Sequence, residues 1–134
     1  MTETQQATAT RILVIDDDQS LLRSIRLSLF LEGYLVETAT DGIDGLEQVE
    51  AGKIDLVILD LQMPRMDGRT FLREIRARGY DMPVLILSAY GADGARDELQ
   101  AEAAIGKPFD PAFLVDKIKS QLPEPSNDDG QSGP

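Results

Sequence analysis

Five polar side chains in this sequence follow short apolar runs, and their types suit chemistry on a phosphoryl group. They are Asp16, Asp17, Asp60, Ser88 and Lys107. Carboxylates in a chain without His or Cys favour a hard cation such as Mg²⁺, which takes oxygen ligands and keeps several waters. A carboxylate beside such a cation can attack phosphorus and form an aspartyl phosphate. The hydroxyl of Ser88 and the ammonium of Lys107 can then position the transferred group and neutralise its charge.

Each of these residues alone has a plainer explanation. An Asp after a strand usually caps a helix or a turn, a Ser there is usually a turn residue, and a single Lys is usually solvated. The prediction therefore depends on the combination of carboxylates, a hydroxyl and an ammonium. A parallel sheet would bring the ends of all these runs to one edge, which is where such sheets bind ligands.

A site of this kind needs a sheet, and the sequence contains five apolar runs at fairly even spacing. The runs are residues 12–15, 34–36, 56–59, 84–87 and a weak one at 103–105. Apolar residues at consecutive positions are typical of strands that are covered on both faces. We therefore expect five parallel strands, with the polar residues named above at their carboxyl ends.

Segments with helical periodicity separate the apolar runs. The expected apolar faces are Leu21, Leu22, Ile25, Leu29 and Phe30; Ile43, Leu46 and Val49; Phe71, Leu72 and Ile75; and Phe113, Leu114, Ile118 and Leu122. Asp18 or Ser20 can cap the first helix, Gly33 suits the left-handed position after it, and Asp110 before Pro111 starts the last. This alternation predicts an α/β fold, a doubly wound five-stranded parallel sheet with right-handed crossovers.

Charge and composition narrow the possible functions. The chain has 134 residues, which suits one domain, and a net charge of −11 from 24 acidic and 13 basic residues. We expect no direct nucleic-acid binding by this chain, because phosphate backbones demand a basic face. No apolar run approaches the ~20 residues of a membrane span, and the start MTETQQATAT lacks the regions of a signal peptide. We therefore expect a cytoplasmic protein without membrane contact.

We expect one domain over residues 11–122 between two polar ends. Residues 1–10 and 123–134 are rich in Pro, Ser, Gly, Asp and Thr, which is typical of a disordered N-terminal tail and of a C-terminal tail or linker stub. No DNA-binding pattern follows the last helix. A stand-alone domain is slightly favoured over one cut from a larger regulator, and the sequence leaves both possibilities open.

Four stretches of the sequence resemble the receiver domain of bacterial two-component response regulators. They are ILVIDDD, DLVILDLQMPRMDG, VLILSAYG and GKPFD, and with their spacing they cover about residues 11–122. The DLQMPRMDG stretch after an apolar strand and the KPF stretch after the last strand are specific as a set. The resemblance implies a flavodoxin-like receiver fold and a phosphoaccepting signalling module, not an enzyme that acts on a separate substrate.

The resemblance also implies a metal-binding and phosphoaccepting role for four residues. Asp60 corresponds to the phosphoacceptor, which takes its phosphoryl group from the phosphohistidine of a histidine kinase or phosphotransfer protein. Asp16 and Asp17 correspond to the acidic pair that organises Mg²⁺ with Asp60, and the backbone carbonyl of Gln62 corresponds to a further ligand. Repulsion within the acidic pair is expected to raise the pKa of at least one carboxyl group when metal is absent.

Other positions correspond to residues that handle or tune the phosphoryl group. Ser88 corresponds to the Thr or Ser that receives a phosphoryl oxygen, and Lys107 to the lysine that pairs with the group. Gln62 and Tyr90 lie two residues beyond Asp60 and Ser88 and resemble family positions that tune hydrolysis. The resemblance also makes the peptide bond between Lys107 and the following proline a candidate for the cis form.

The sequence departs from the family in the region that carries output. Most members have Tyr, Phe or His three residues before the lysine, where this chain has Ala104, so the usual aromatic switch is absent. The spacing from Ser88 to Lys107 is about one helical turn short. We therefore expect a shortened fourth helix within residues 92–101, an activation route in which Tyr90 replaces the switch, and a downstream protein target whose identity is unknown.

Two other functions stay open at this stage. A Mg²⁺-dependent phosphohydrolase would use Asp16 as its nucleophile, because Asp16, Asp18 and Ser20 loosely fit the DxDx[T/V/S] loop of haloacid-dehalogenase-like phosphatases. That hypothesis leaves Asp60 and the KPF stretch unexplained. A pseudo-receiver would bind partners without phosphorylation. Under the receiver hypothesis Asp18 lies outside the metal-binding pair and caps the first helix, where negative charge is favoured.

Overall fold

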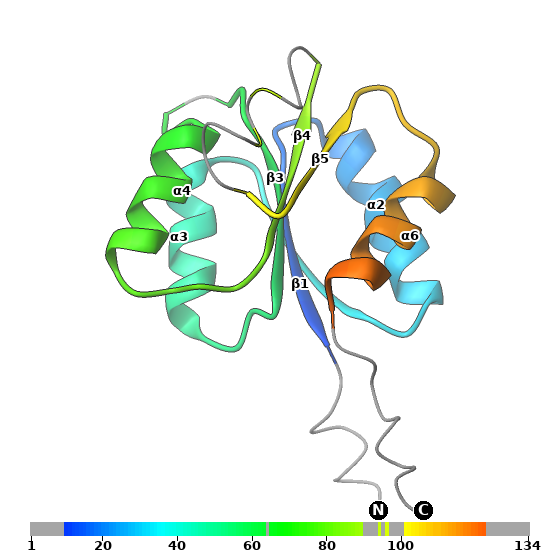
Figure 1. Cartoon of the computed structure of the whole chain (residues 1–134), viewed down its shortest axis with the longest axis horizontal. Helices are drawn as coiled ribbons and strands as arrows, with labels where there is room; N and C mark the ends of the chain where they lie inside the picture. The colour runs from blue at the N-terminus through cyan, green and yellow to red at the C-terminus, as the bar shows by residue number, and fades with distance from the viewer. Residues whose placement is uncertain (1–9, 64, 90–93, 95, 97–100, 123–134) are drawn as a thin grey trace, which may run out of the picture.

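The chain forms one five-stranded sheet with helices on both faces (Figure 1). The computed structural model describes residues 10–63, 65–89, 94, 96 and 101–122. The strands follow the order β2-β1-β3-β4-β5, and every pair of neighbours is parallel. This is the predicted doubly wound α/β fold, in which the order of strands reverses beside β1.

Strands and helices alternate along the described chain. The strands are β1 (Arg11–Ile15), β2 (Leu35–Ala39), β3 (Leu56–Asp60), β4 (Val84–Ser88) and β5 (Ala103–Gly106). The described helices are α2 (Gln19–Leu31), α3 (Gly42–Ala51), α4 (Gly68–Ala77) and α6 (Pro111–Gln121). Helices α2 and α6 lie on one face of the sheet, and α3 and α4 lie on the other (Figure 1).

Two apolar layers, one on each face, hold the sheet and helices together. Side chains of β1 point alternately to the two faces, so Ile12 and Val14 belong to the layer under α2 and α6. Leu13 and Ile15 belong to the layer under α3 and α4. The central strands β1, β3 and β4 are buried almost throughout, which explains their continuous apolar sequences.

The edge strand β2 lies further along the chain than predicted. The sequence indicated residues 34–36, but the strand runs from Leu35 to Ala39 and includes Glu37 and Thr38. Strand β2 pairs with β1 alone and is less buried than the central strands, so its sequence needs no continuous apolar run. The weak run at residues 103–105 was placed correctly and forms β5 at the opposite edge.

Most residues of the predicted helix faces are buried, three (Leu21, Leu46 and Leu122) are partly buried, and three are exposed. Phe30 in α2 is 68% exposed, Phe113 in α6 is 49% exposed and Ile43 in α3 is 39% exposed. The prediction was wrong for these side chains because a helix buries only one stripe of its surface against the sheet. Phe30 follows the fully buried Leu29, and one step along a helix turns the side chain by about 100°, away from the layer beneath.

An aspartate caps the N-terminus of every described helix. Each capping residue has extended backbone and accepts a hydrogen bond from an amide of the first turn; the four are Asp18, Asp41, Asp67 and Asp110. The predicted caps at Asp18 and Asp110 are thereby confirmed. Gly33 has a φ of 96°, as the left-handed position after α2 requires.

Several predicted features fall outside the described residues. They are the polar ends over residues 1–9 and 123–134, Tyr90, and most of the expected fourth helix within residues 92–101. The shortening of that helix and the disorder of the ends therefore stay predictions. Among the residues that the structure describes, no helix has the length and apolar character needed to cross a membrane.

The start of α4 approaches the backbone beside Asp60 closely enough to demand glycine. A Cβ added at Gly68 would lie 2.4 Å from the carbonyl oxygen of Asp60 and 2.8 Å from Leu61 Cα. We expect Gly68→Ala to lower the free energy of unfolding by about 1–3 kcal/mol, because backbone atoms must shift. Urea unfolding measures the loss. Gly106→Ala is the control, since its Cβ would meet nothing within 4 Å. Equal losses in both variants would contradict the close approach.

Candidate functional site

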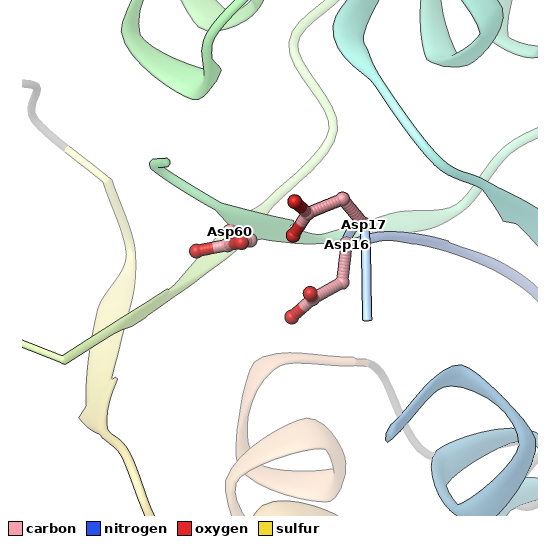
Figure 2. Close-up of side chains that lie close together, drawn as sticks. All are labelled: Asp16, Asp17 and Asp60. Atoms are coloured by element: carbon pink, nitrogen blue, oxygen red, sulfur yellow. The ribbon is translucent and has the colours of Figure 1, made fainter. Parts of the chain in front are cut away.

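Three carboxylates converge at the carboxyl ends of β1 and β3 (Figure 2). Asp16 and Asp17 directly follow β1, and Asp60 is the last residue of the neighbouring strand β3. One oxygen from each carboxylate lies within 4.8 Å of the other two. Asp16 and Asp60 are 0% and 4% exposed, whereas Asp17 is open to solvent. The cluster therefore has a buried base and an accessible side.

The ammonium of Lys107 reaches this carboxylate cluster from the end of β5. Its Nζ donates a hydrogen bond of 2.9 Å to Asp16 Oδ2 and lies 3.6 Å from Asp60 Oδ1. The backbone N–H of Lys107 donates to the carbonyl of Ser88 over 2.8 Å, and the Lys107-Pro108 bond is cis, as predicted. Ser88 is the last residue of β4 and is buried. The structure thus brings all five predicted polar side chains to one edge of the sheet.

An open cleft of ≈ 620 Å³ lies beside Asp60. It is lined by Leu61, Gln62, Met63, Asp67, Arg69 and Ser88. The amide N–H of Gln62 donates a 3.3 Å hydrogen bond to Asp60 Oδ1, so the loop after β3 turns back toward the carboxylate. Gln62 was predicted to tune hydrolysis and Ser88 to receive a phosphoryl oxygen, and both residues line the cleft. Arg69 also lines the cleft and was not predicted, because no motif distinguishes it from the other arginines of the sequence.

Burial and crowding raise the pKa of the Asp60 carboxyl group to about 6. Removal from water is the larger cause and the negative charge of Asp16 is the next, while the Gln62 N–H and Lys107 oppose both. This rise is at Asp60, outside the acidic pair for which the sequence predicted one, and burial contributes more to it than charge repulsion. Burial disfavours the charged form of Lys107, but its contacts with Asp16 and Asp60 outweigh burial and raise the pKa of the ammonium.

The loop between β3 and α4 is anchored to the start of α3. The Arg65 guanidinium donates to Asp41 Oδ2, with Nε at 2.7 Å, and Asp41 is almost fully buried. The N–H of Gly42 donates to the Met66 carbonyl over 3.0 Å, and a Cβ at Gly42 would lie 2.6 Å from that oxygen. Arg65 has a φ of 64°, a left-handed backbone that these contacts hold in place. This ion pair was not predicted, because an Asp before a helical pattern indicates a cap but does not indicate a distant partner.

Asp18 caps α2, and Ser20 lies in its first turn. Asp18 Oδ1 accepts a 3.1 Å hydrogen bond from the Leu21 N–H, and Ser20 Oγ accepts one from Arg23. The backbone N–H of Asp18 donates to Asp16 Oδ1 over 2.9 Å. Two of the three adjacent aspartates therefore join the cluster, and the third connects it to α2. The phosphohydrolase hypothesis, which places Asp18 in the reaction, gains no support from this arrangement.

Ala104 occupies the position at which most receiver domains have an aromatic residue. It pairs with Ile86 of the neighbouring strand and packs against the apolar layer under α3 and α4. Its methyl group offers no ring that could turn in response to Ser88. Tyr90, the expected substitute, lies outside the described residues. The tuning roles of Gln62 and Tyr90 stay predictions.

The ligand atoms of the cluster suit a hard divalent cation. All three side chains supply carboxylate oxygen, and the chain has no His or Cys to attract a softer metal. Asp16, Asp17 and Asp60 carry three negative charges when ionised, and Lys107 supplies one positive charge. When ionised, the cluster therefore keeps two negative charges that Lys107 does not balance, and one divalent cation can neutralise both.

The sequence of this chain is similar to those of known response regulators. The family model for the response regulator receiver domain matches residues 12–119. The response regulator MprA of Mycobacterium sp. (strain KMS) is 37% identical over 127 residues, which cover 92% of this chain and 55% of that protein. The chain spans about half the length of the curated relatives it matches.

Solved structures support the same likeness. The response regulator TrrA from Thermotoga maritima, in complex with Mg²⁺-BeF, is 33% identical with a TM-score of 0.77, and the match covers 84% of this chain and 99% of that one. A CheY-like response regulator receiver domain protein from Methanospirillum hungatei is 31% identical with a TM-score of 0.78, over 84% of this chain and 92% of that one.

The raised pKa of Asp60 predicts a pH dependence of stability. Between about pH 4 and pH 6 the folded chain holds a proton that the unfolded chain has released, so the contribution of Asp60 is full at low pH and is lost as pH rises through about 6. In EDTA, we expect the unfolding free energy of the parent protein relative to Asp60→Asn to fall by about 1–3 kcal/mol from pH 4 to pH 7. Urea unfolding of both proteins measures this. A difference independent of pH would contradict the assignment.

Proposed function

This chain belongs to the response regulator receiver domain family, and we propose that it accepts a phosphoryl group on Asp60 in a two-component phosphorelay. The observation that carries the proposal is the convergence of Asp16, Asp17 and Asp60 within 4.8 Å beside the Lys107 ammonium. A phosphoryl group adds negative charge at a point that already has an excess of it. Only a site built to collect positive charge can accept such a group.

Asp60 is the nucleophile in this proposal. One carboxylate oxygen attacks the phosphorus of a phosphohistidine on a histidine kinase or phosphotransfer protein; the P–N bond breaks and the imidazole leaves with the bonding electrons. Asp60 must be ionised to attack. Lys107, 3.6 Å away, favours the ionised form, whereas burial opposes it. Positive charge at the cluster therefore makes Asp60 reactive as well as holding the incoming group.

Mg²⁺ is the cofactor that fits this set of ligands. Asp16, Asp17 and Asp60 would hold it together with the backbone carbonyl of Gln62, and bound Mg²⁺ would neutralise charge on the transferring oxygens. The complex of TrrA with Mg²⁺-BeF supports this choice of metal.

Lys107 and Ser88 supply hydrogen-bond donors to the phosphoryl group. Lys107 Nζ lies between Asp16 and Asp60, so it can turn to a phosphoryl oxygen on Asp60 without a change in the backbone. The Ser88 hydroxyl, at the end of the next strand, donates to a second oxygen. Gln62 and Tyr90 flank the approach and set the rate at which water hydrolyses the aspartyl phosphate.

Phosphorylation changes the binding of a downstream protein. Ala104 provides no aromatic ring to follow Ser88, so the change passes through another residue, for which we propose Tyr90. The chain acts in the cytoplasm as a signalling domain, without a separate substrate and without direct contact to nucleic acid, in line with its net charge of −11.

The acceptor assignment predicts where label is found. With acetyl phosphate and Mg²⁺, we expect mass spectrometry to detect one phosphoryl group on the parent protein, located on Asp60 by peptide mapping, and none on Asp60→Asn. Asp18→Asn is the control, because asparagine keeps the helix cap, and it should be labelled like the parent. Label on Asp16 would favour a phosphohydrolase, and no Mg²⁺-dependent label would favour a pseudo-receiver.

The metal assignment is tested without any phosphoryl transfer. We expect Mg²⁺ to raise the melting temperature of the parent protein, because it binds the folded cluster, and Asp17→Asn to weaken the apparent affinity about tenfold or more. Asp17 is exposed, so this variant should fold. Asp18→Asn changes the same charge one residue away and should leave the affinity unchanged. Equal weakening by both variants would show a general effect of charge rather than ligation.

A further inference from the structure

A groove lies between α2 and the edge strand β2, outside the carboxylate cluster. Its larger part is a cavity of ≈ 450 Å³ lined by Arg23, Arg26, Leu27, Phe30, Tyr34, Leu35 and Val36. A second cavity of ≈ 260 Å³ shares both arginines and continues along Thr38 and Thr40. These two cavities together are called the α2–β2 groove below. It has an apolar end, a polar end and two arginines in both parts.

The apolar end exposes large side chains to solvent. Leu27, Phe30 and Leu35 are 60%, 68% and 43% exposed, and the neighbouring Leu31 is 72% exposed. Single exposed apolar residues are common, but several gathered on two adjacent elements usually mark a binding surface. These side chains belong to neither of the two apolar layers. Packing of the fold therefore does not explain why they are apolar.

The arginines of the groove oppose the charge of the chain. The net charge is −11, yet α2 has no acidic residue over Gln19–Leu31 and its two charged residues are Arg23 and Arg26. Within the described part of the chain, Arg23 donates to a serine hydroxyl and Arg26 forms no ion pair. The groove is therefore a local positive site on an acidic protein.

Nearby glutamates are already engaged with other cations. Glu32 at the end of α2 pairs with Lys119 of α6 over 2.9 Å, and Glu37 in β2 pairs with Arg11 over 2.8 Å. Carboxylates for the groove arginines must therefore come from elsewhere.

The shape of the groove suits a helix. Positions 23, 26, 27 and 30 follow at three- and four-residue steps and form a ridge about 10 Å long on one flank of α2. Glu32, which contacts α6, lies on the opposite flank, where α2 and α6 already pack side by side (Figure 1). A helix in the groove would extend this layer over β2, with its side chains between those of the ridge.

We propose that the α2–β2 groove docks an amphipathic helix of a partner protein, with an apolar stripe against Leu27, Phe30 and Val36 and flanking carboxylates on Arg23 and Arg26. The apolar contacts supply most of the affinity, and the ion pairs select acidic helices and set their orientation. A second copy of this chain fits less well, because it carries the same net charge and its glutamates near the groove are paired. An anionic membrane is disfavoured by the repulsion between its surface and a chain of net charge −11.

The test uses a synthetic helical peptide of about 18 residues, with a leucine stripe flanked by glutamates. We expect it to bind saturably with a Kd of about 1–100 µM and to shift backbone NMR signals of residues 19–40 selectively. A second peptide with lysine in place of each glutamate should bind at least about tenfold more weakly.

Variants locate the contact. Phe30→Ala and the double variant Arg23→Glu/Arg26→Glu should each weaken binding of the acidic peptide about tenfold or more. Phe113→Ala and Arg73→Glu are matched controls on exposed residues of α6 and α4 and should bind normally. Each variant's thermal unfolding is measured alongside. The arginine variant should still take a phosphoryl group on Asp60, so failure of the groove proposal is distinguishable from failure of the proposed function.

Three results would overturn the proposal. One is no saturable binding of the acidic peptide up to about 1 mM, and another is equal binding of the lysine peptide. The third is evidence for a different occupant: a dimer in sedimentation that Phe30→Ala abolishes, or binding to phosphatidylserine vesicles that the arginine variant loses while the peptide has no effect.

Discussion

Three carboxylates within 4.8 Å, two of them removed from water, form the interaction on which the rest of this structure depends. Such an arrangement is unfavourable without nearby positive charge, and the fold supplies one ammonium, from Lys107. Burial and, after it, the charge of Asp16 raise the pKa of Asp60. The negative charge that Lys107 leaves unbalanced favours a divalent cation. The proposed phosphoryl transfer and the proposed metal binding thus depend on the same crowded carboxylates. Apolar layers that bury the sheet on both faces provide the stability against which this crowding is maintained.

Several contacts position the described residues between β3 and α4, which follow Asp60 in the chain. Gly68 lets the start of α4 approach the backbone of Asp60, and Gly42 lets α3 approach the carbonyl of Met66. The ion pair between Arg65 and Asp41 closes the loop from the other side. None of these residues belongs to the carboxylate cluster, yet they set the path of the chain on which the Gln62 amide reaches Asp60. The geometry of the site is therefore a property of the loop and two helix ends as well as of the residues within it.

Sequence reasoning located the site because the ends of buried strands are strongly marked: a continuous apolar run that stops at Asp60 has one plausible structure in a parallel sheet. It placed β2 wrongly because an edge strand tolerates residues such as Glu37, and it assigned Phe30 to the core because periodicity does not give the width of the buried stripe. The partnership of Arg65 with Asp41 could not be predicted, since a sequence does not show which distant charges meet. Local sequence patterns thus predicted the strands, helices and caps. The bounds of β2, the exposure of Phe30 and the partner of Asp41 depend on tertiary contacts.

Helix α2 connects the two charged regions of the molecule. Its cap, Asp18, donates its backbone N–H to Asp16 in the carboxylate cluster, and its second and third turns carry Arg23 and Arg26 in the groove. The cluster requires positive charge and the groove requires negative charge, so ligands of opposite sign are drawn to the two regions even though the whole chain is acidic. Local charge rather than net charge therefore decides what each surface can bind. Helix α2 has no acidic residues and begins next to the carboxylate cluster, so it separates these two preferences along one element.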